Sequence, residues 1–123
     1  MKLPDIVGQP ATTIEEHFPA ANTAVAVTIA AATGRRHYVR GFTVSCNGTP
    51  ATALEVKIVT DSGGTPVTLD HFYVPAAAFA PIIHNYASPL RGKPGKDVKI
   101  TVTAPGVGIS AGAVLRVYTA EAQ

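Results

Sequence analysis

Residues 53–74 show the clearest pattern of hydrophobic and polar positions in the chain. Two alternating runs flank a turn-rich hexapeptide at residues 61–66, and this arrangement predicts a β-hairpin. Because side chains alternate across a strand, the apolar side chains of the hairpin should share one surface that faces the core. The predicted core residues of the hairpin are Leu54, Val56, Ile58, Val67 and Leu69.

Similar alternating runs recur along the chain and are separated by turn-forming sequences. Gly41 interrupts the alternation of one run, which predicts a β-bulge or a close approach of two backbones. Residues 87–95 contain two prolines and two glycines, so we expect a long loop there. The predicted strands are residues 24–30, 36–46, 53–60, 67–74, 82–86, 97–103 and 111–119.

These runs amount to about seven or eight short strands, and no segment shows sustained helical periodicity. Short strands at regular spacing favour an antiparallel sandwich or barrel. An immunoglobulin domain with its Cys–Trp–Cys signature is excluded, because the chain has no Trp and a single Cys, Cys46. We therefore predict an all-β, antiparallel β-sandwich of the jelly-roll type over residues 23–123.

Residues 1–22 differ from the rest, because three prolines interrupt them and their pattern predicts neither a strand nor a long helix. Residues 13–16 match a capping box, which allows one helical turn over residues 15–18. Two interpretations stay open: a frayed terminus, or an extended N-terminal arm that docks on a neighbouring molecule. The second is favoured because the segment carries more apolar side chains than a purely solvated tail. These candidate interface residues are Leu3, Ile6, Val7, Ile14 and Phe18.

Composition adds a preference for assembly. The chain has 123 residues, enough for one domain, and charged residues make up 15%, against about 25% in an average soluble domain. A net charge of +2 is too small to indicate nucleic acid or a membrane surface, and no apolar run is long enough to span a bilayer. No signal peptide is expected. Around the predicted long loop, Arg91 and Lys93 are candidate contacts to an acidic partner surface.

The sequence contains no pattern that indicates catalysis. No Gly-x-Ser-x-Gly elbow or phosphate-binding loop is present, and Asp70 and His71 should point to opposite faces of a strand. The histidines lie on separate elements without the spacing of a zinc motif. We therefore expect a protein that is not an enzyme, with no catalytic residue, metal or cofactor. The four histidines are His17, His37, His71 and His84.

Five sequence segments together carry a family resemblance over the last hundred residues of the chain. They are Arg-Arg-His-Tyr-Val-Arg-Gly-Phe-Thr-Val-Ser (35–45), Leu-Glu-Val-Lys-Ile-Val-Thr-Asp-Ser-Gly-Gly (54–64), Ala-Pro-Ile-Ile (80–83), Gly-Lys-Asp-Val-Lys-Ile-Thr-Val-Thr-Ala-Pro-Gly-Val-Gly (95–108) and Gly-Ala-Val-Leu-Arg-Val-Tyr (112–118). In this order they resemble the small β-sandwich structural proteins of tailed bacteriophages, most closely capsid decoration (cement) proteins.

The resemblance implies a virion structural protein on the capsid surface, assembled in the host cytoplasm. It would bind the major capsid protein as a dimer or trimer and stabilise the shell, with no nucleic acid or membrane partner. An alternative is a tail-fibre, receptor-binding or carbohydrate-binding module, because Tyr38, Tyr73, Tyr86 or Tyr118 could stack on sugar rings. A small cupin-like enzyme is a third alternative, which the absence of His-x-His spacing disfavours.

Overall fold

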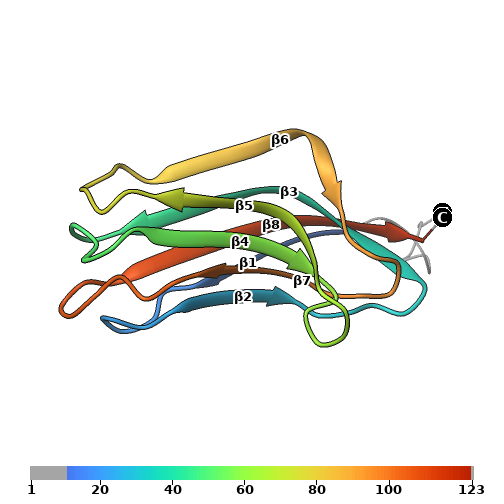
Figure 1. Cartoon of the computed structure of the whole chain (residues 1–123). Coiled ribbons are helices and arrows are strands. Elements are labelled where there is room, and N and C mark those ends of the chain that lie inside the picture. Colours follow the sequence, from blue (N-terminus) through green and yellow to red (C-terminus); the bar gives the residue numbers. More distant parts are fainter. Residues whose placement is uncertain (1–10, 123) are drawn as a thin grey trace.

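The computed structural model describes residues 11–122, which form eight β-strands in two antiparallel sheets packed face to face (Figure 1). One sheet has the strand order β1-β8-β3-β6, and the other has the order β2-β7-β4-β5. Within the described range, no helix is both long and apolar enough to cross a membrane. The strands are β1 (Ala11–His17), β2 (Val25–Ile29), β3 (Arg35–Cys46), β4 (Leu54–Thr60), β5 (Val67–Val74), β6 (Ile82–Arg91), β7 (Val98–Val102) and β8 (Ala111–Glu121).

The pairing of the strands defines a jelly roll. Antiparallel ladders join β1 to β8, β2 to β7, β3 to β6 and β4 to β5. This is the pattern of one long hairpin folded over and wrapped so that its pairs alternate between two sheets. Two further ladders, β3 with β8 and β4 with β7, join the pairs into two four-stranded sheets. The predicted all-β, antiparallel jelly-roll sandwich is confirmed.

The core lies between the sheets and follows the predicted alternation. Strands β2, β4 and β7 bury every second residue, as their patterns predict. Each fully buried Val, Leu or Ile contributes about 1.5–3 kcal/mol relative to an exposed one. The buried hydrophobic residues are Val25, Val27, Ile29, Val39, Phe42, Val44, Leu54, Val56, Ile58, Val74, Val98, Ile100, Val102, Ala111, Ala113, Leu115 and Val117.

The return strand of the central hairpin departs from the prediction. Ile58 pairs with Asp70 but Val59 pairs with Thr68, so one extra residue of β5 bulges between them. The bulge shifts the inward face of β5 to Asp70, Phe72 and Val74, and Val67 lies opposite buried Thr60 at the end of this edge strand. The predicted core position of Val67 is wrong, since that residue is 43% exposed, whereas Leu69 is partly buried and packs against the core.

The N-terminal prediction is wrong in part. Residues 11–17 are neither a helical turn nor irregular; they are strand β1, paired with β8 from Ala11↔Thr119 to His17↔Ala113. Pairing with a central strand outweighs the local capping signal, and β-branched Thr12, Thr13 and Ile14 suit a strand. Residues 1–10, with the candidate residues Leu3, Ile6 and Val7, lie outside the described residues.

Strand β6 is longer than the sequence predicts. The expected loop begins too early, because residues 87–91 continue the strand. Pro89 is tolerated because it lies in a stretch of the edge strand β6, residues 86–89, that has no partner in the β3 ladder, so its missing N–H breaks no pairing. The bulge predicted at Gly41 is confirmed, since the register shifts between Val39 and Gly41 in both ladders of β3.

Candidate binding face

The ladders of the β1-β8-β3-β6 sheet align outward-facing residues in rows across all four strands. Directly opposite residues of an antiparallel ladder share one face of the sheet. We call the outward-facing residues of three such rows, together with Arg40 and Phe18, the four-strand face. The rows are Ile14–Arg116–Gly41–Asn85, Thr12–Tyr118–Tyr38–Arg91 and Glu16–Val114–Thr43–Ile83.

Arg116 occupies the centre of this face and is held there by several hydrogen bonds. Its Nη1 donates to Thr43 Oγ1 at 3.0 Å and its Nη2 donates to the carbonyl oxygen of Phe42 at 2.9 Å. Nη2 also lies 3.3 Å from Asn85 Oδ1. The guanidinium therefore lies across β3 as a fixed positive charge.

Gly41 is the residue that makes room for this arrangement. A Cβ at this position would lie 2.6 Å from Asn85 Oδ1 and 3.1 Å from Arg116 Nη2, and it would collide with the carbonyl oxygen of His84. Any larger residue would push β6 and the guanidinium away from β3. The absence of a side chain at Gly41 therefore allows both the pairing of β6 with β3 and the position of Arg116 on the four-strand face.

Arg40 and two tyrosines add a second cationic and aromatic group. Arg40 has no pairing partner, because the register of both neighbouring strands passes from Val39 to Gly41. Its guanidinium carbon lies 5.9 Å from the ring centroid of Tyr118, a cation–π distance. The rings of Tyr118 and Tyr38 are 6.1 Å apart. Arginine and tyrosine are the residue types enriched at the energetic centres of protein interfaces.

Large apolar side chains frame the same face. Ile14, Phe18 and Ile83 are 60%, 58% and 66% exposed. The ring of Phe18 lies over Gly112, where any Cβ would collide with it. A hollow of about 300 Å³ lies beside Ile14 and is lined by Thr12, Ile14, Arg40, Asn85, Tyr86 and Arg116.

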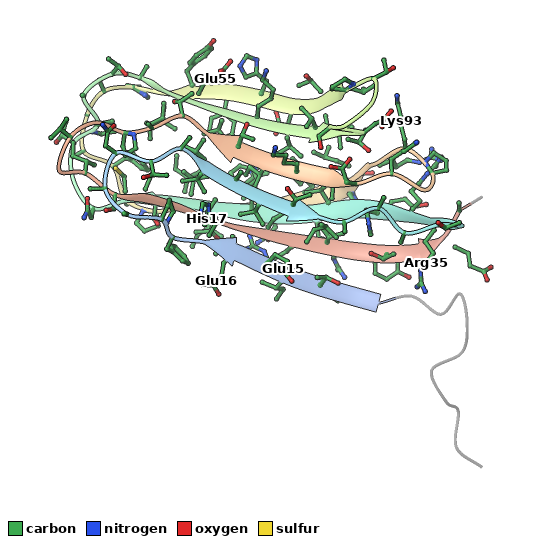
Figure 2. The ribbon with its side chains drawn as sticks, turned by 90° about the horizontal axis from the view of Figure 1, so that it is seen from below. Glu15, Glu16, His17, Arg35, Glu55 and Lys93 are labelled. Atoms are coloured by element: carbon green, nitrogen blue, oxygen red, sulfur yellow. The ribbon has the colours of Figure 1, made fainter. Side chains whose placement is uncertain are left out.

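The two outer surfaces of the sandwich differ in character. On the four-strand face, three arginines outnumber one acid, Glu16. On the opposite sheet, Glu55 binds His71 at 2.8 Å and accepts a hydrogen bond from Tyr73 at 3.3 Å. Figure 2 shows Glu16 and Glu55 on opposite sides of the molecule. The opposite sheet also carries outward-facing Lys57 and Lys99, so the two surfaces differ chiefly in the exposed aliphatic and phenyl side chains of Ile14, Phe18 and Ile83 on the β1-β8-β3-β6 side.

The structure brings together three of the seven predicted interface residues. Ile14, Phe18 and Arg91 lie on the four-strand face, although they come from different parts of the chain. Sequence reasoning missed Arg116, Arg40 and Ile83. The break in alternation at Gly41 was the one available signal, because it marks where β3 changes register with both of its neighbours.

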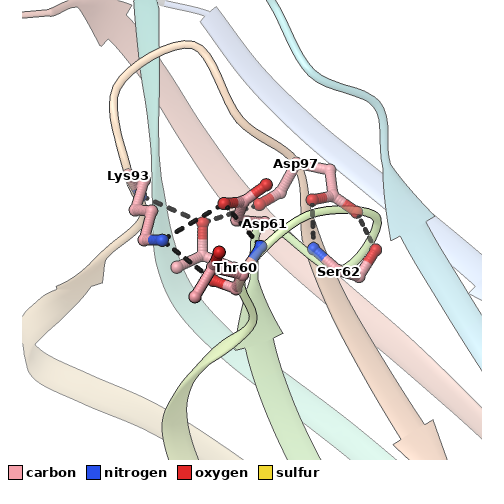
Figure 3. A network of polar contacts seen from close by, with 6 residues as sticks. Thr60, Asp61, Ser62, Lys93 and Asp97 are labelled. Atoms are coloured by element: carbon pink, nitrogen blue, oxygen red, sulfur yellow. Dashed lines mark hydrogen bonds and ion pairs between the residues drawn. The ribbon is translucent and has the colours of Figure 1, made fainter.

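Lys93 lies elsewhere and serves a structural network (Figure 3). Its Nζ lies 3.1 Å from Asp61 Oδ2 and donates to the carbonyl oxygen of Thr65 at 2.8 Å. Its backbone N–H donates to Thr60 Oγ1, whose hydroxyl donates to the carbonyl oxygen of Asp97. The network ties the β4–β5 turn to the β6–β7 loop.

The hydrogen bond from Lys93 lowers the pKa of Asp61 below its usual 3.8, and the charges of Lys93 and Lys96 act in the same direction. A carboxylate with a lowered pKa stabilises the fold above about pH 4 and loses that contribution as the pH falls through the lowered value. Asp61 has a φ of 60°, which Asn also tolerates.

Replacing Asp61 with Asn should therefore lower the free energy of unfolding at neutral pH, and the difference from the native protein should shrink as the pH falls through the lowered pKa of Asp61. Urea denaturation across this pH range measures it, and Lys93→Gln should reproduce the effect by removing the other partner. A difference that stays constant with pH would show that Asp61 acts through its shape and not through its charge.

A second concave feature lies between the edge strands β5 and β6. Phe42 is its buried centre, with the rings of Phe72, His84 and Tyr86 at centroid distances of 5.6, 5.7 and 6.1 Å. We call it the aromatic cleft; its volume is about 250 Å³ and it is lined by Phe42, Asp70, Phe72, Ile82 and His84.

A hydrogen bond at the margin of the aromatic cleft keeps the phenol of Tyr86 protonated. Tyr86 donates to Asp70 Oδ2 at 2.6 Å. Burial, together with this bond to Asp70, raises the pKa of Tyr86 far above its usual value, so the phenol keeps its proton. As predicted, Asp70 and His71 point to opposite faces, since His71 instead binds Glu55.

The histidines occupy structural positions. His37 is buried and bridges Thr119 Oγ1 at 2.7 Å and the carbonyl oxygen of Ala30 at 2.8 Å. His17 Nδ1 accepts from the backbone N–H of Ala26. Among residues 11–122, no group of three or more His, Cys, Asp or Glu side chains is arranged to hold a metal ion.

Neither the family models nor the curated proteins include a match to this chain. Among solved structures, the chain is similar to the crystal structure of the CBM36-1 domain of a multidomain xylanase from the hindgut metagenome of Trinervitermes trinervoides. The two are 15% identical with a TM-score of 0.41, over 92% of this chain and 99% of that chain. A likeness at this level carries no argument about what this chain binds.

Proposed function

We propose that this protein is a non-catalytic structural protein of a virus particle, which attaches to the outer surface of the major capsid shell and stabilises it. The observation that carries the proposal is the four-strand face. Three exposed apolar side chains lie on it, Ile14, Phe18 and Ile83. It also carries Arg116, which hydrogen bonds hold in place, and Arg40, which makes a cation–π contact with Tyr118. This composition is typical of a protein-binding surface.

The positive charge of the four-strand face favours a partner surface that carries carboxylates. Arg40, Arg91 and Arg116 face outwards beside a single acid, Glu16. A shell surface that presents carboxylates around an apolar patch would complement it, because opposite potentials steer and orient docking. The resemblance of the sequence to capsid decoration proteins supports the proposal that this partner is the major capsid protein.

The size of the face supports attachment through several copies. Four strands about 4.8 Å apart and about 23 Å long cover roughly 440 Å² of projected area, against about 800 Å² per partner in a standard interface. One copy would bind weakly, whereas a dimer or trimer held on a repeating shell would gain affinity by avidity. Each copy that bridges neighbouring shell subunits would raise the free energy needed to separate them.

Co-sedimentation of the purified protein with shells that lack it tests the proposal. Binding should saturate at a copy number comparable to that of the shell subunits, and loaded shells should resist heat or low salt better than bare ones. Failure of the protein to sediment with the shells at any concentration would contradict it.

The aromatic cleft favours a second candidate function, binding of a carbohydrate ring. Sugars present apolar faces that stack on aromatic rings and hydroxyls that bond to carboxylates, and the cleft offers Phe72, His84 and Asp70 for these contacts. His84→Ala should weaken binding on a glycan panel about tenfold or more. His71→Ala, on the opposite side of β5, is the matched control and should bind normally. No binding to any glycan by the native protein would remove this candidate.

A further inference from the structure

A groove at one end of the sandwich gathers positive charge from β3 and from the end of β6 with the loop that follows it. It lies where the start of β3 meets the β6–β7 loop and the beginning of β5, and its volume is about 380 Å³. We call it the arginine groove. Arg36, Arg91 and Lys93 line it together with apolar Val67 and Leu69, and no acid is among its lining residues.

The charge of Lys93 is already compensated within the protein. Its ammonium binds Asp61 and the carbonyl oxygen of Thr65, and these contacts hold it in the loop network (Figure 3). Two guanidinium groups, those of Arg36 and Arg91, therefore line the groove without an ion-pair partner among residues 11–122. Like charges that share a small space repel each other, and an anion between them removes that cost.

The buried Nε atom of Arg36 indicates a ligand in the groove. This atom is shielded from solvent and has no hydrogen-bond partner among the described residues. A buried donor without an acceptor destabilises the fold, and more strongly where the donor is charged. Folded proteins rarely leave such a donor unsatisfied, and a water molecule or an ion often supplies the missing acceptor.

We propose that the arginine groove binds a compact oxyanion group, a carboxylate or a phosphate. The planar fork of an arginine side chain pairs with two oxygens of such a group and distinguishes it from a spherical halide. Val67 and Leu69 form an apolar wall that suits the carbon part of a molecule bearing the anion. The groove meets the four-strand face at Arg91, whereas Arg36, Lys93, Val67 and Leu69 lie outside the rows of that face.

The test is an NMR titration of the isotope-labelled whole chain with inorganic phosphate and with acetate at constant ionic strength. Saturable shifts of the Arg36 Nε–H signal and of the Gly92 and Lys93 amides are expected with at least one of the two anions. Saturation by phosphate alone identifies a phosphate group, and saturation by acetate alone identifies a carboxylate. Shifts that rise linearly with both anions over the whole surface would overturn the proposal as a general ionic effect.

Substitutions of Arg36 and Arg40 separate the groove from the four-strand face, whereas Arg91 belongs to both. Arg91→Gln changes an exposed side chain and should weaken binding about tenfold or more, the loss expected for one charge-assisted hydrogen bond. Arg36→Gln should do the same. Arg40→Gln removes an equal charge from the four-strand face and should leave anion binding unchanged. Equal weakening by all three variants would overturn the site, because it would show only a response to net charge.

Discussion

Replacing Gly41 with alanine should destabilise the protein by about 3 kcal/mol, near the upper end of the cost of overpacking. The added Cβ would meet the carbonyl oxygen of His84 and the Oδ1 of Asn85, both on β6. Backbone atoms cannot rotate away, so β6 would have to move from β3. Urea denaturation monitored by circular dichroism measures the change in the free energy of unfolding.

The same substitution should alter the four-strand face. Displacement of β6 would break the contact between Arg116 and Asn85, and hydrogen exchange of the β6 amides should accelerate. Gly63→Ala is the matched control, because a Cβ there meets nothing within 4 Å, and its effect should stay within about 0.5 kcal/mol. Equal stability of the two variants would mean that β3 and β6 are not packed as closely as described.

The double substitution Ile14→Asp and Ile83→Asp should reduce attachment to shells by about 100-fold or more. Both side chains are largely exposed in edge strands, so the fold should tolerate the change within about 1 kcal/mol. Two carboxylates on the face would leave buried charges against an apolar partner patch and would cancel part of the arginine charge. Co-sedimentation across a concentration series measures the loss.

Val107→Asp provides the control for this variant. Val107 is 89% exposed and lies in the loop between β7 and β8, away from the three rows of the face. It tests whether any new surface carboxylate disturbs attachment, and it should bind as the native protein does. If Val107→Asp lost as much affinity as the double variant, general charge and not the four-strand face would govern attachment.

Alternation was enough to predict most of the core. Val25, Ile100 and Leu115 are buried where the period of two places them, because one face of each sheet meets the other sheet. Two bulges limited the prediction. The one at Gly41 leaves a signal in the sequence, whereas the one beside Ile58 does not, so the inward face of β5 from Asp70 to Val74 was not predicted.

The four-strand face could not be predicted from the sequence, because the pairing register of the strands decides which residues become neighbours on it. Ile14 and Arg116 are far apart along the chain, and only the β1–β8 ladder makes them neighbours. The assignment of β1 itself depended on pairing with β8, which no local pattern encodes. Similarly, the charge of Lys93 was visible in the sequence, but its compensation by Asp61 was not.

A cryo-electron microscopy reconstruction of shells saturated with the protein tests the central claim most directly. Density for the sandwich should lie on the outer surface with the β1-β8-β3-β6 sheet against the shell, and Ile14, Arg116 and Ile83 should be within contact distance of the major capsid protein. Density that places the β2-β7-β4-β5 sheet against the shell, or that shows no sandwich on the surface, would contradict it.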